Sequence, residues 1–152
     1  MALKFLTPET RDEFVQRFMS IQADTRPKWG TMTSSRMLSH LRYFFNASNG
    51  TVQMPDQSNF ITRTIAPWLF FHLFTNWPKG RLKVPEQYTP PPDDDFERER
   101  ELTIQAMDAY LEALKQEPQR REISALLGPI TLEYWTRVHG VHCDHHLRQF
   151  GV

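Results

Sequence analysis

The sequence predicts an all-α protein, and two observations carry that prediction. Four long segments place apolar residues three or four positions apart, the spacing that puts them on one face of a helix. No segment shows the regular alternation of apolar and polar residues that is typical of a half-buried strand. Because 152 residues match the size of one domain with its own core, we expect residues 1–152 to form a single domain.

The first helix is expected to begin directly after Thr7. Thr7 is a favoured N-cap, Pro8 suits the first helical position, and Glu9 places a negative charge in the first turn. Residues 24–30 contain a proline that cannot continue the helix, so we expect the helix to end there. Its inner face consists of Phe14, Phe18 and Ile21.

The second helix is expected to run from Thr33 to about Asn49, because Gly50 then follows as a typical helix terminator. One stripe of this helix combines apolar residues with a histidine at its centre. That histidine therefore lies on a line that faces the core. The stripe consists of Met37, His40, Phe44 and Ala47.

Two further helices complete the set. Three aspartates at positions 93–95 suit a helix N-terminus, and Pro118 ends the third helix. The fourth helix is expected from Thr131, after a Gly-Pro pair, to Gly151. Its inner face consists of Trp135, Val138, His139, His142, His146 and Gln149.

Residues 51–92 form a long insertion between the second and third helices, rich in proline and aromatic residues. Its most apolar part, residues 65–74, is shorter than the ~20 residues that span a bilayer, so we expect a short buried helix there. We interpret the insertion as a crossover between two helices that run in the same direction. Whether it also serves as a lid or pocket wall stays open at this point.

The composition excludes several classes of function. Lys and Arg together number 18, as do Asp and Glu, so the formal net charge is zero and no basic stripe indicates nucleic acid or a membrane surface. A single cysteine excludes an intrachain disulfide framework and favours a reducing compartment. We therefore expect a cytoplasmic protein, without a signal peptide, that binds neither nucleic acid nor membranes.

Three inward-facing histidines predict a metal site. His142 and His146 lie one helical turn apart, roughly 6 Å along the axis, a spacing that lets two imidazoles converge on one ion. The residues between them lack the glutamate of the His-Glu-x-x-His protease motif, which excludes that type of enzyme. Packed helices lie about 8–10 Å apart, so His40 on the second helix is placed to supply the third ligand.

Two neighbours are candidates for the shell around these ligands. His139 lies one turn before His142, and Gln149 is placed to hydrogen-bond a ligand or a bound water. For His139, and for His145 on the other side, simple packing in the core is the favoured interpretation.

The segments around the three ligands carry recognisable motifs. They read Met37-Leu38-Ser39-His40-Leu41 and His142-Cys143-Asp144-His145-His146-Leu147-Arg148-Gln149. Both resemble the signatures of the DinB-like superfamily of four-helix bundles, which also contains the YfiT-like metal-dependent hydrolases. Three further segments resemble a largely uncharacterised branch of it: Lys28-Trp29-Gly30-Thr31-Met32-Thr33, Trp77-Pro78-Lys79-Gly80 and His145-His146-Leu147-Arg148-Gln149-Phe150-Gly151.

The resemblance implies a four-helix bundle in up-down-down-up order with a divalent metal, commonly nickel or zinc, held by His40, His142 and His146. Some members of the superfamily are thiol transferases, and many have no assigned activity. This sequence departs from the commoner ending His-Arg-Gly-Gln, because Leu147 and Arg148 follow His146. The ligand keeps its place, but the arginine is shifted by one position, which puts any borrowed role for it in doubt.

Two classes of function fit these features. Three neutral imidazoles leave a coordination position open, so the first is a metal-dependent thiol transferase or hydrolase that activates a thiol or water against a small-molecule substrate. A low-molecular-weight thiol is then a second expected cofactor, and a homodimer is a candidate assembly. The alternative is a non-catalytic, stress-related bundle that binds a metal or a small ligand. In a further variant of this alternative, the metal only holds the helices together. Whether the protein is an enzyme at all stays open on the sequence alone.

Overall fold

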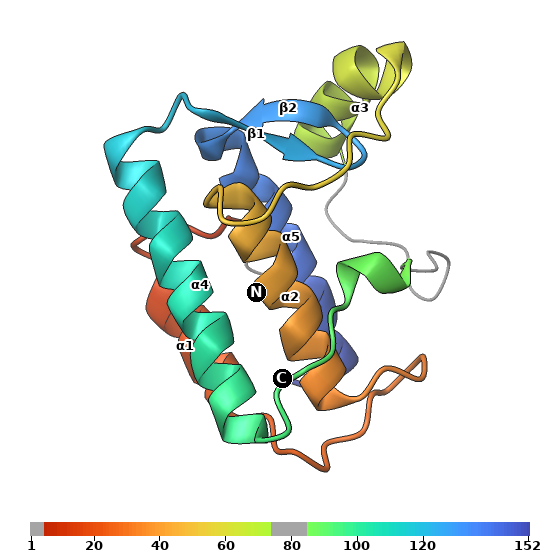
Figure 1. The fold of residues 1–152 in the computed structure, drawn as a ribbon, viewed down its shortest axis with the longest axis vertical. Coiled ribbons are helices and arrows are strands. Elements are labelled where there is room, and N and C mark those ends of the chain that lie inside the picture. Colours follow the sequence, from red (N-terminus) through yellow and green to blue (C-terminus); the bar gives the residue numbers. More distant parts are fainter. Residues whose placement is uncertain (1–4, 74–84) are drawn as a thin grey trace.

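A computed structural model describes residues 5–73 and 85–152 of the chain. Within these ranges the protein is mainly helical, with five α-helices, a single 3-10 turn and one two-stranded hairpin (Figure 1). The elements are α1 (Arg11–Met19), α2 (Ser34–Ser48), α3 (Phe60–His72), η1 (Glu86–Tyr88), α4 (Phe96–Gln116), β1 (Arg121–Ser124), β2 (Gly128–Thr131) and α5 (Leu132–Gln149).

The helices α1, α2, α4 and α5 enclose the main core. α2 lies against α4 and α5, while the hairpin and α3 lie together at one end of the molecule (Figure 1). Large apolar side chains from all four helices are fully buried between them, which removes their surface from water and stabilises the packing. They include Phe14, Phe18, Met37, Leu38, Leu41, Phe45, Met107, Tyr110, Leu132, Trp135 and Leu147.

Three of the four expected helix starts are confirmed by their N-caps. The side chain of Thr33 accepts a hydrogen bond from the amide of Arg36, and that of Thr131 accepts one from the amide of Tyr134. At α4, the Asp95 carboxylate accepts hydrogen bonds from the first-turn amides. These caps fix the starts of the helices that carry or support the histidines.

The expectation that Thr7 caps the first helix is wrong. Thr10 is the N-cap and α1 begins at Arg11, after a turn over residues 8–10. The backbone amide of Thr7 donates to the Thr10 side-chain oxygen, whose hydroxyl in turn donates to the carbonyl of Phe5. These bonds hold the segment as a separate turn before the helix starts.

The hairpin was not expected from the sequence. β1 and β2 pair antiparallel, with Arg121 opposite Thr131 and Ser124 opposite Gly128. Each strand has four residues, too few for an alternating pattern to stand out. Gly128 has a φ of +75°, and a Cβ there would lie 2.8 Å from the Ser58 hydroxyl, so the close approach requires glycine.

The apolar stretch of the insertion forms a helix, as expected, but the helix is not buried. In α3, Phe60 is 79% exposed and Trp68 is 59% exposed, because the helix packs on the hairpin end with one side only. Residues 74–84, with the Trp77-Pro78-Lys79-Gly80 motif, lie outside the described residues. Among the helices of the described ranges, none is both long and apolar enough to cross a bilayer.

Candidate metal centre

Three histidine side chains from two helices meet in the interior. His40 lies near the middle of α2, and His142 and His146 lie one turn apart on α5. The Nε2 atom of His142 is 3.0 Å from that of His40 and 3.2 Å from that of His146. All three ligand atoms lie within 4.8 Å of one another, and all three residues are buried. The structure therefore brings together the three residues that the sequence singles out.

The outer ring nitrogens of two of these histidines are fixed by carbonyl acceptors. His40 Nδ1 lies 2.8 Å from the backbone oxygen of Tyr88, and His146 Nδ1 lies 2.9 Å from Oε1 of Gln149. A carbonyl oxygen only accepts, so each Nδ1 carries the proton and each Nε2 keeps its lone pair. Both lone pairs then face His142, whose Nε2 carries at most one proton when neutral. Lone pairs that converge in this way can bind a shared cation.

The surroundings keep the imidazoles neutral. Burial lowers the pKa of His40 to about 4; the hydrogen bond to the carbonyl of Tyr88 opposes this shift, and the charge of His145 adds to it. Burial, followed by repulsion from His40 and other histidines, also holds the pKa values of His142 and His146 well below the usual range. At neutral pH all three are therefore free bases, which is the form that binds a metal.

The spacing of the nitrogens fits a single ion. Nitrogens bound at about 2.1 Å lie about 3.4 Å apart in a tetrahedral site and about 3.0 Å apart at adjacent octahedral positions. The observed 3.0 and 3.2 Å for the two pairs around His142 fall within that interval. These two pairs therefore match the spacing around a single divalent metal, and the ligand atoms of the third pair, His40 and His146, lie within 4.8 Å of each other.

Gln149, one of the two expected neighbours, contacts the cluster directly. Its side-chain oxygen faces Nδ1 of His146, while its side-chain nitrogen donates to the carbonyl of Trp29 at 2.8 Å. Gly30 leaves room for this amide, because a Cβ at that position would lie 3.0 Å from Nε2 of Gln149. The loop before α2 thus takes part in orienting a ligand on α5.

His139, the other expected neighbour, is engaged elsewhere. Its Nε2 lies 2.7 Å from the hydroxyl of Ser48, and its ring stacks on Trp135 with centroids 5.0 Å apart. Burial lowers the pKa of His139 to about 3. Its ring also contacts those of Phe45 and Tyr110. The contacts are those of a core residue, and His145 likewise packs on Trp29 and on the ring of His146.

Two features of the site had no signal in the sequence. The acceptor for His40 is a backbone carbonyl, that of Tyr88, which any residue type would provide. The ring of Phe44 lies against two of the histidines, with centroids 4.9 Å from His40 and 4.7 Å from His142. Phe44 belongs to the expected apolar stripe, but its neighbours are set by the packing of α2 on α5.

The shifted arginine of the α5 motif faces away from this cluster. Arg148 Nε lies 2.9 Å from the carboxylate of Asp144, which also accepts from Arg17 of α1 at 3.1 Å. Asp144 is thus held by two cations and is not available as a base for the histidines. Cys143 is fully buried, and burial raises the pKa of its thiol, which argues against a nucleophilic role.

No protein-family model, no curated protein and no solved structure matches this chain, so its function has to be argued from the site itself.

Proposed function

We propose that His40, His142 and His146 hold one divalent ion, zinc or nickel, and that the protein is a metal-dependent enzyme of the DinB-like type. The observation that carries this proposal is the convergence of three buried, neutral imidazoles with Nε2 atoms 3.0 and 3.2 Å apart. Without a cation, two lone pairs point at one neighbour that has at most one proton to donate. A shared ion removes that conflict.

The proposed fold is a four-helix bundle in up-down-down-up order, with residues 51–92 as the crossover. Its support is the course of the chain in Figure 1, where α2 and α4 run in one direction and α1 and α5 run in the other. The end of the crossover lies on the site, since Tyr88 binds His40 and Pro90 accepts a hydrogen bond from Ser39. This segment therefore contributes to the ligand geometry as well as connecting two helices.

The reaction that we propose is the activation of a thiol or a water toward a small electrophile, as a thiol transferase or a hydrolase. A divalent ion with three imidazole ligands supplies an open position and lowers the pKa of a thiol or water bound there. The chain itself contributes orientation through Tyr88 and Gln149 and an apolar wall through Phe44. Asp144 is paired with arginines, so no role as general base is assigned to it.

A non-catalytic metal-binding bundle is the second candidate, and the depth of the site favours it. His40 is 1% exposed, His142 is 7% exposed and His146 is 5% exposed. A substrate must displace covering side chains to reach such a site, whereas a metal that pins helices needs no access. Water-proton relaxation of the nickel form separates the two, because only an open site exchanges a bound water with solvent.

The test begins with elemental analysis of the purified protein and reconstitution with zinc or nickel, followed by assays of thiol addition and hydrolysis on small electrophiles. We expect the original protein to bind about one ion per chain. The variant His142→Ala should bind none while keeping its helical circular dichroism signal. His72→Ala is the matched control, because His72 lies on α3 with its side chain exposed. Full activity of the metal-free protein, or stoichiometric metal in His142→Ala, would refute the proposal.

A further inference from the structure

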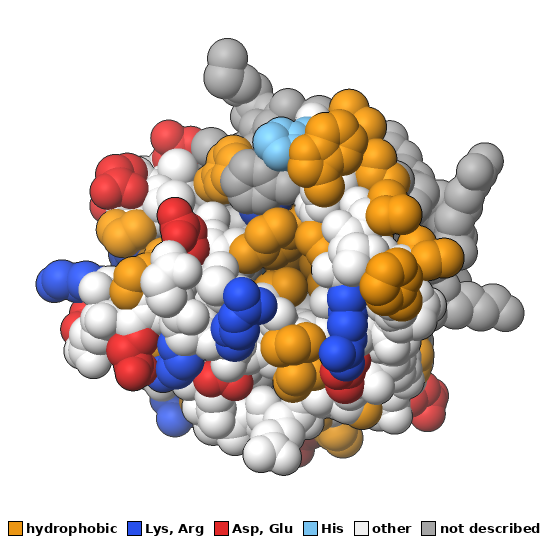
Figure 2. All heavy atoms as spheres, turned by 90° about the horizontal axis from the view of Figure 1, so that it is seen from above, with side chains coloured by type: hydrophobic (Ala, Val, Ile, Leu, Met, Phe, Trp, Pro, Cys, Tyr) orange, Lys and Arg blue, Asp and Glu red, His pale blue; other side chains and the backbone are white. Residues whose placement is uncertain are grey.

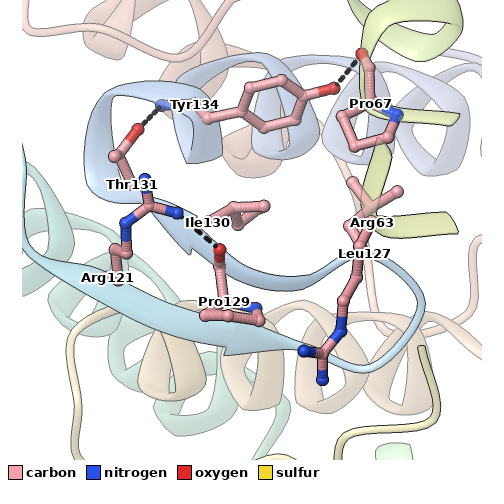
Figure 3. Close-up of a pocket in the computed structure, with 8 residues that line it drawn as sticks. All are labelled: Arg63, Pro67, Arg121, Leu127, Pro129, Ile130, Thr131 and Tyr134. Carbon is pink, nitrogen blue, oxygen red and sulfur yellow. Dashed lines mark hydrogen bonds between the residues drawn. The ribbon is translucent and has the colours of Figure 1, made fainter. Parts of the chain in front are cut away.

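A second candidate site lies at the hairpin end of the molecule. A cavity of about 390 Å³ opens between α3, the hairpin and the first turn of α5 (Figure 3). None of its lining residues belongs to the histidine cluster, and Tyr134 precedes His142 by two helical turns. The lining consists of Arg63, Pro67, Arg121, Leu127, Pro129, Ile130, Thr131 and Tyr134.

The floor of this cavity is apolar and held in place. Leu127 and Ile130 are buried members of the main core, so their positions are fixed by packing. The hydroxyl of Tyr134 donates to the carbonyl of Pro67 and ties α5 to α3 across one wall (Figure 3). A volume of this size is within the range of small-ligand pockets in proteins.

The charge at the rim is positive. The lining contains two arginines and no acidic residue. Arg63 is already engaged, because Asp56 and Ser58 accept its hydrogen bonds. Arg121 donates through Nη1 to the carbonyl of Pro129 at 3.0 Å, and among the described residues it forms no ion pair. Its remaining N–H groups are therefore available to a ligand.

Arg121 lines the edge of the cavity where the hairpin meets α5. In Figure 3 its guanidinium lies beside Thr131 at the start of α5, with one nitrogen bonded to the carbonyl of Pro129. The N-terminus of this 18-residue helix adds a favourable field for negative charge. Seen from above, this end of the molecule presents apolar side chains, with both basic and acidic side chains beside them (Figure 2).

We propose that this cavity binds a small amphipathic anion, namely a carboxylate carried on a short alkyl or aryl group. The carboxylate pairs with the free N–H groups of Arg121, and the apolar group lies on Leu127, Ile130 and Pro67. A fully polar anion would leave the floor uncovered, and the lack of an acidic lining residue disfavours a cation. The site is independent of the metal centre.

Calorimetric titration with butanoate, hexanoate and octanoate tests this assignment. We expect affinity to rise by up to about fourfold for each added methylene, the factor that corresponds to about 0.8 kcal/mol, and 1-hexanol to bind more weakly than hexanoate. Arg121→Gln is expected to weaken octanoate binding about tenfold and to abolish the preference for the acid over the alcohol. Arg98→Gln, an exposed arginine on α4 paired with Glu101, is the matched control and should bind like the original protein.

Three outcomes would overturn the assignment. The first is unchanged octanoate affinity in Arg121→Gln, which would indicate adsorption on the exposed apolar face of α3. The second is loss of binding in His142→Ala, which would place the carboxylate at the metal centre instead. The third is a dimer in sedimentation experiments that octanoate does not dissociate, which would identify a second copy of the chain as the occupant. If His142→Ala still binds octanoate, the cavity binds the anion without the metal centre. This proposal can then hold even if the proposed function is refuted.

Discussion

His146 and Gln149 form a hydrogen-bonded pair within one turn of α5, with Nδ1 of the imidazole 2.9 Å from Oε1 of the amide. The same amide donates to the carbonyl of Trp29, so its orientation is fixed from both ends. A side-chain amide held in this way presents only its oxygen to His146. Gln149 therefore sets the tautomer of His146, a proposed metal ligand. Gln149 is itself oriented by Trp29, which lies in a loop more than a hundred residues earlier in the chain.

Gln149→Ala should weaken metal binding while leaving the fold intact. Removal of the acceptor frees the ring of His146 to rotate and to change tautomer, and the loss of such a partner typically costs about 10- to 100-fold in metal affinity. Competition with a chromophoric chelator measures this change. Gln119→Ala is the control, because Gln119 bonds to Glu133 on the surface. Equal affinities in the two variants would show that the amide does not position the ligand.

Metal should raise the stability of the protein, because an ion that binds only the folded state adds its binding free energy to folding. At an ion concentration of 1,000 times Kd the gain is about 4 kcal/mol. Thermal unfolding with and without zinc or nickel measures it, and we expect the shift to vanish in His146→Ala. A shift that persists in this variant would place the stabilising ion outside the cluster.

The helices and the ligand trio were predictable because both follow from spacing along the chain. The stripe that contains His40 and the four-residue interval between His142 and His146 determine which side chains face inward. The hairpin was missed because Arg121–Ser124 and Gly128–Thr131 are stabilised mainly by pairing with each other rather than by a pattern of their own. The acceptors of the site depend on contacts between segments distant in sequence, such as Tyr88 with His40.

The exposure of α3 has a similar cause. A helix with Phe60, Ile65 and Trp68 has the composition of a buried segment, and only the three-dimensional arrangement determines whether a partner covers it. In the described structure, α3 contacts the hairpin end through one side, where Pro67 meets Tyr134. Composition predicted the helix but not its surroundings.

The metal-free protein should lose stability on acidification below about pH 6.5. Burial lowers the pKa of His139 to about 3 in the folded state, whereas the unfolded chain binds the proton near pH 6.5. The unfolded state therefore holds more protons between these values. The contribution of His139 to stability is complete above pH 6.5 and falls by about 1.4 kcal/mol per pH unit below it. The three clustered histidines, whose pKa values are also lowered by burial, add to this loss.

Urea unfolding between pH 7.5 and 5 measures this slope. His139→Gln should make the slope shallower by about 1.4 kcal/mol per pH unit, because glutamine does not titrate and still offers a polar group to Ser48. The lowered pKa values of His40, His142 and His146 maintain the remaining slope. His72→Gln, on the exposed face of α3, is the control. A slope unchanged in His139→Gln would mean that other groups account for the acid sensitivity.

Arg42→Ala should be among the most destabilising changes of a partly exposed residue in this protein. The carboxylate of Glu99 is fully buried and accepts from Nε of Arg42 at 2.7 Å and from the amide of Asp93. Removal of the arginine leaves a buried charge without its cation, which typically costs about 3–5 kcal/mol.

Arg98→Ala breaks an exposed pair with Glu101 and should cost under about 1 kcal/mol. Urea unfolding compares the two variants, and the double variant Arg42→Ala/Glu99→Gln should be more stable than Arg42→Ala alone. If Arg42→Ala costs no more than Arg98→Ala, the pair between α2 and α4 does not stabilise the packing that places His40.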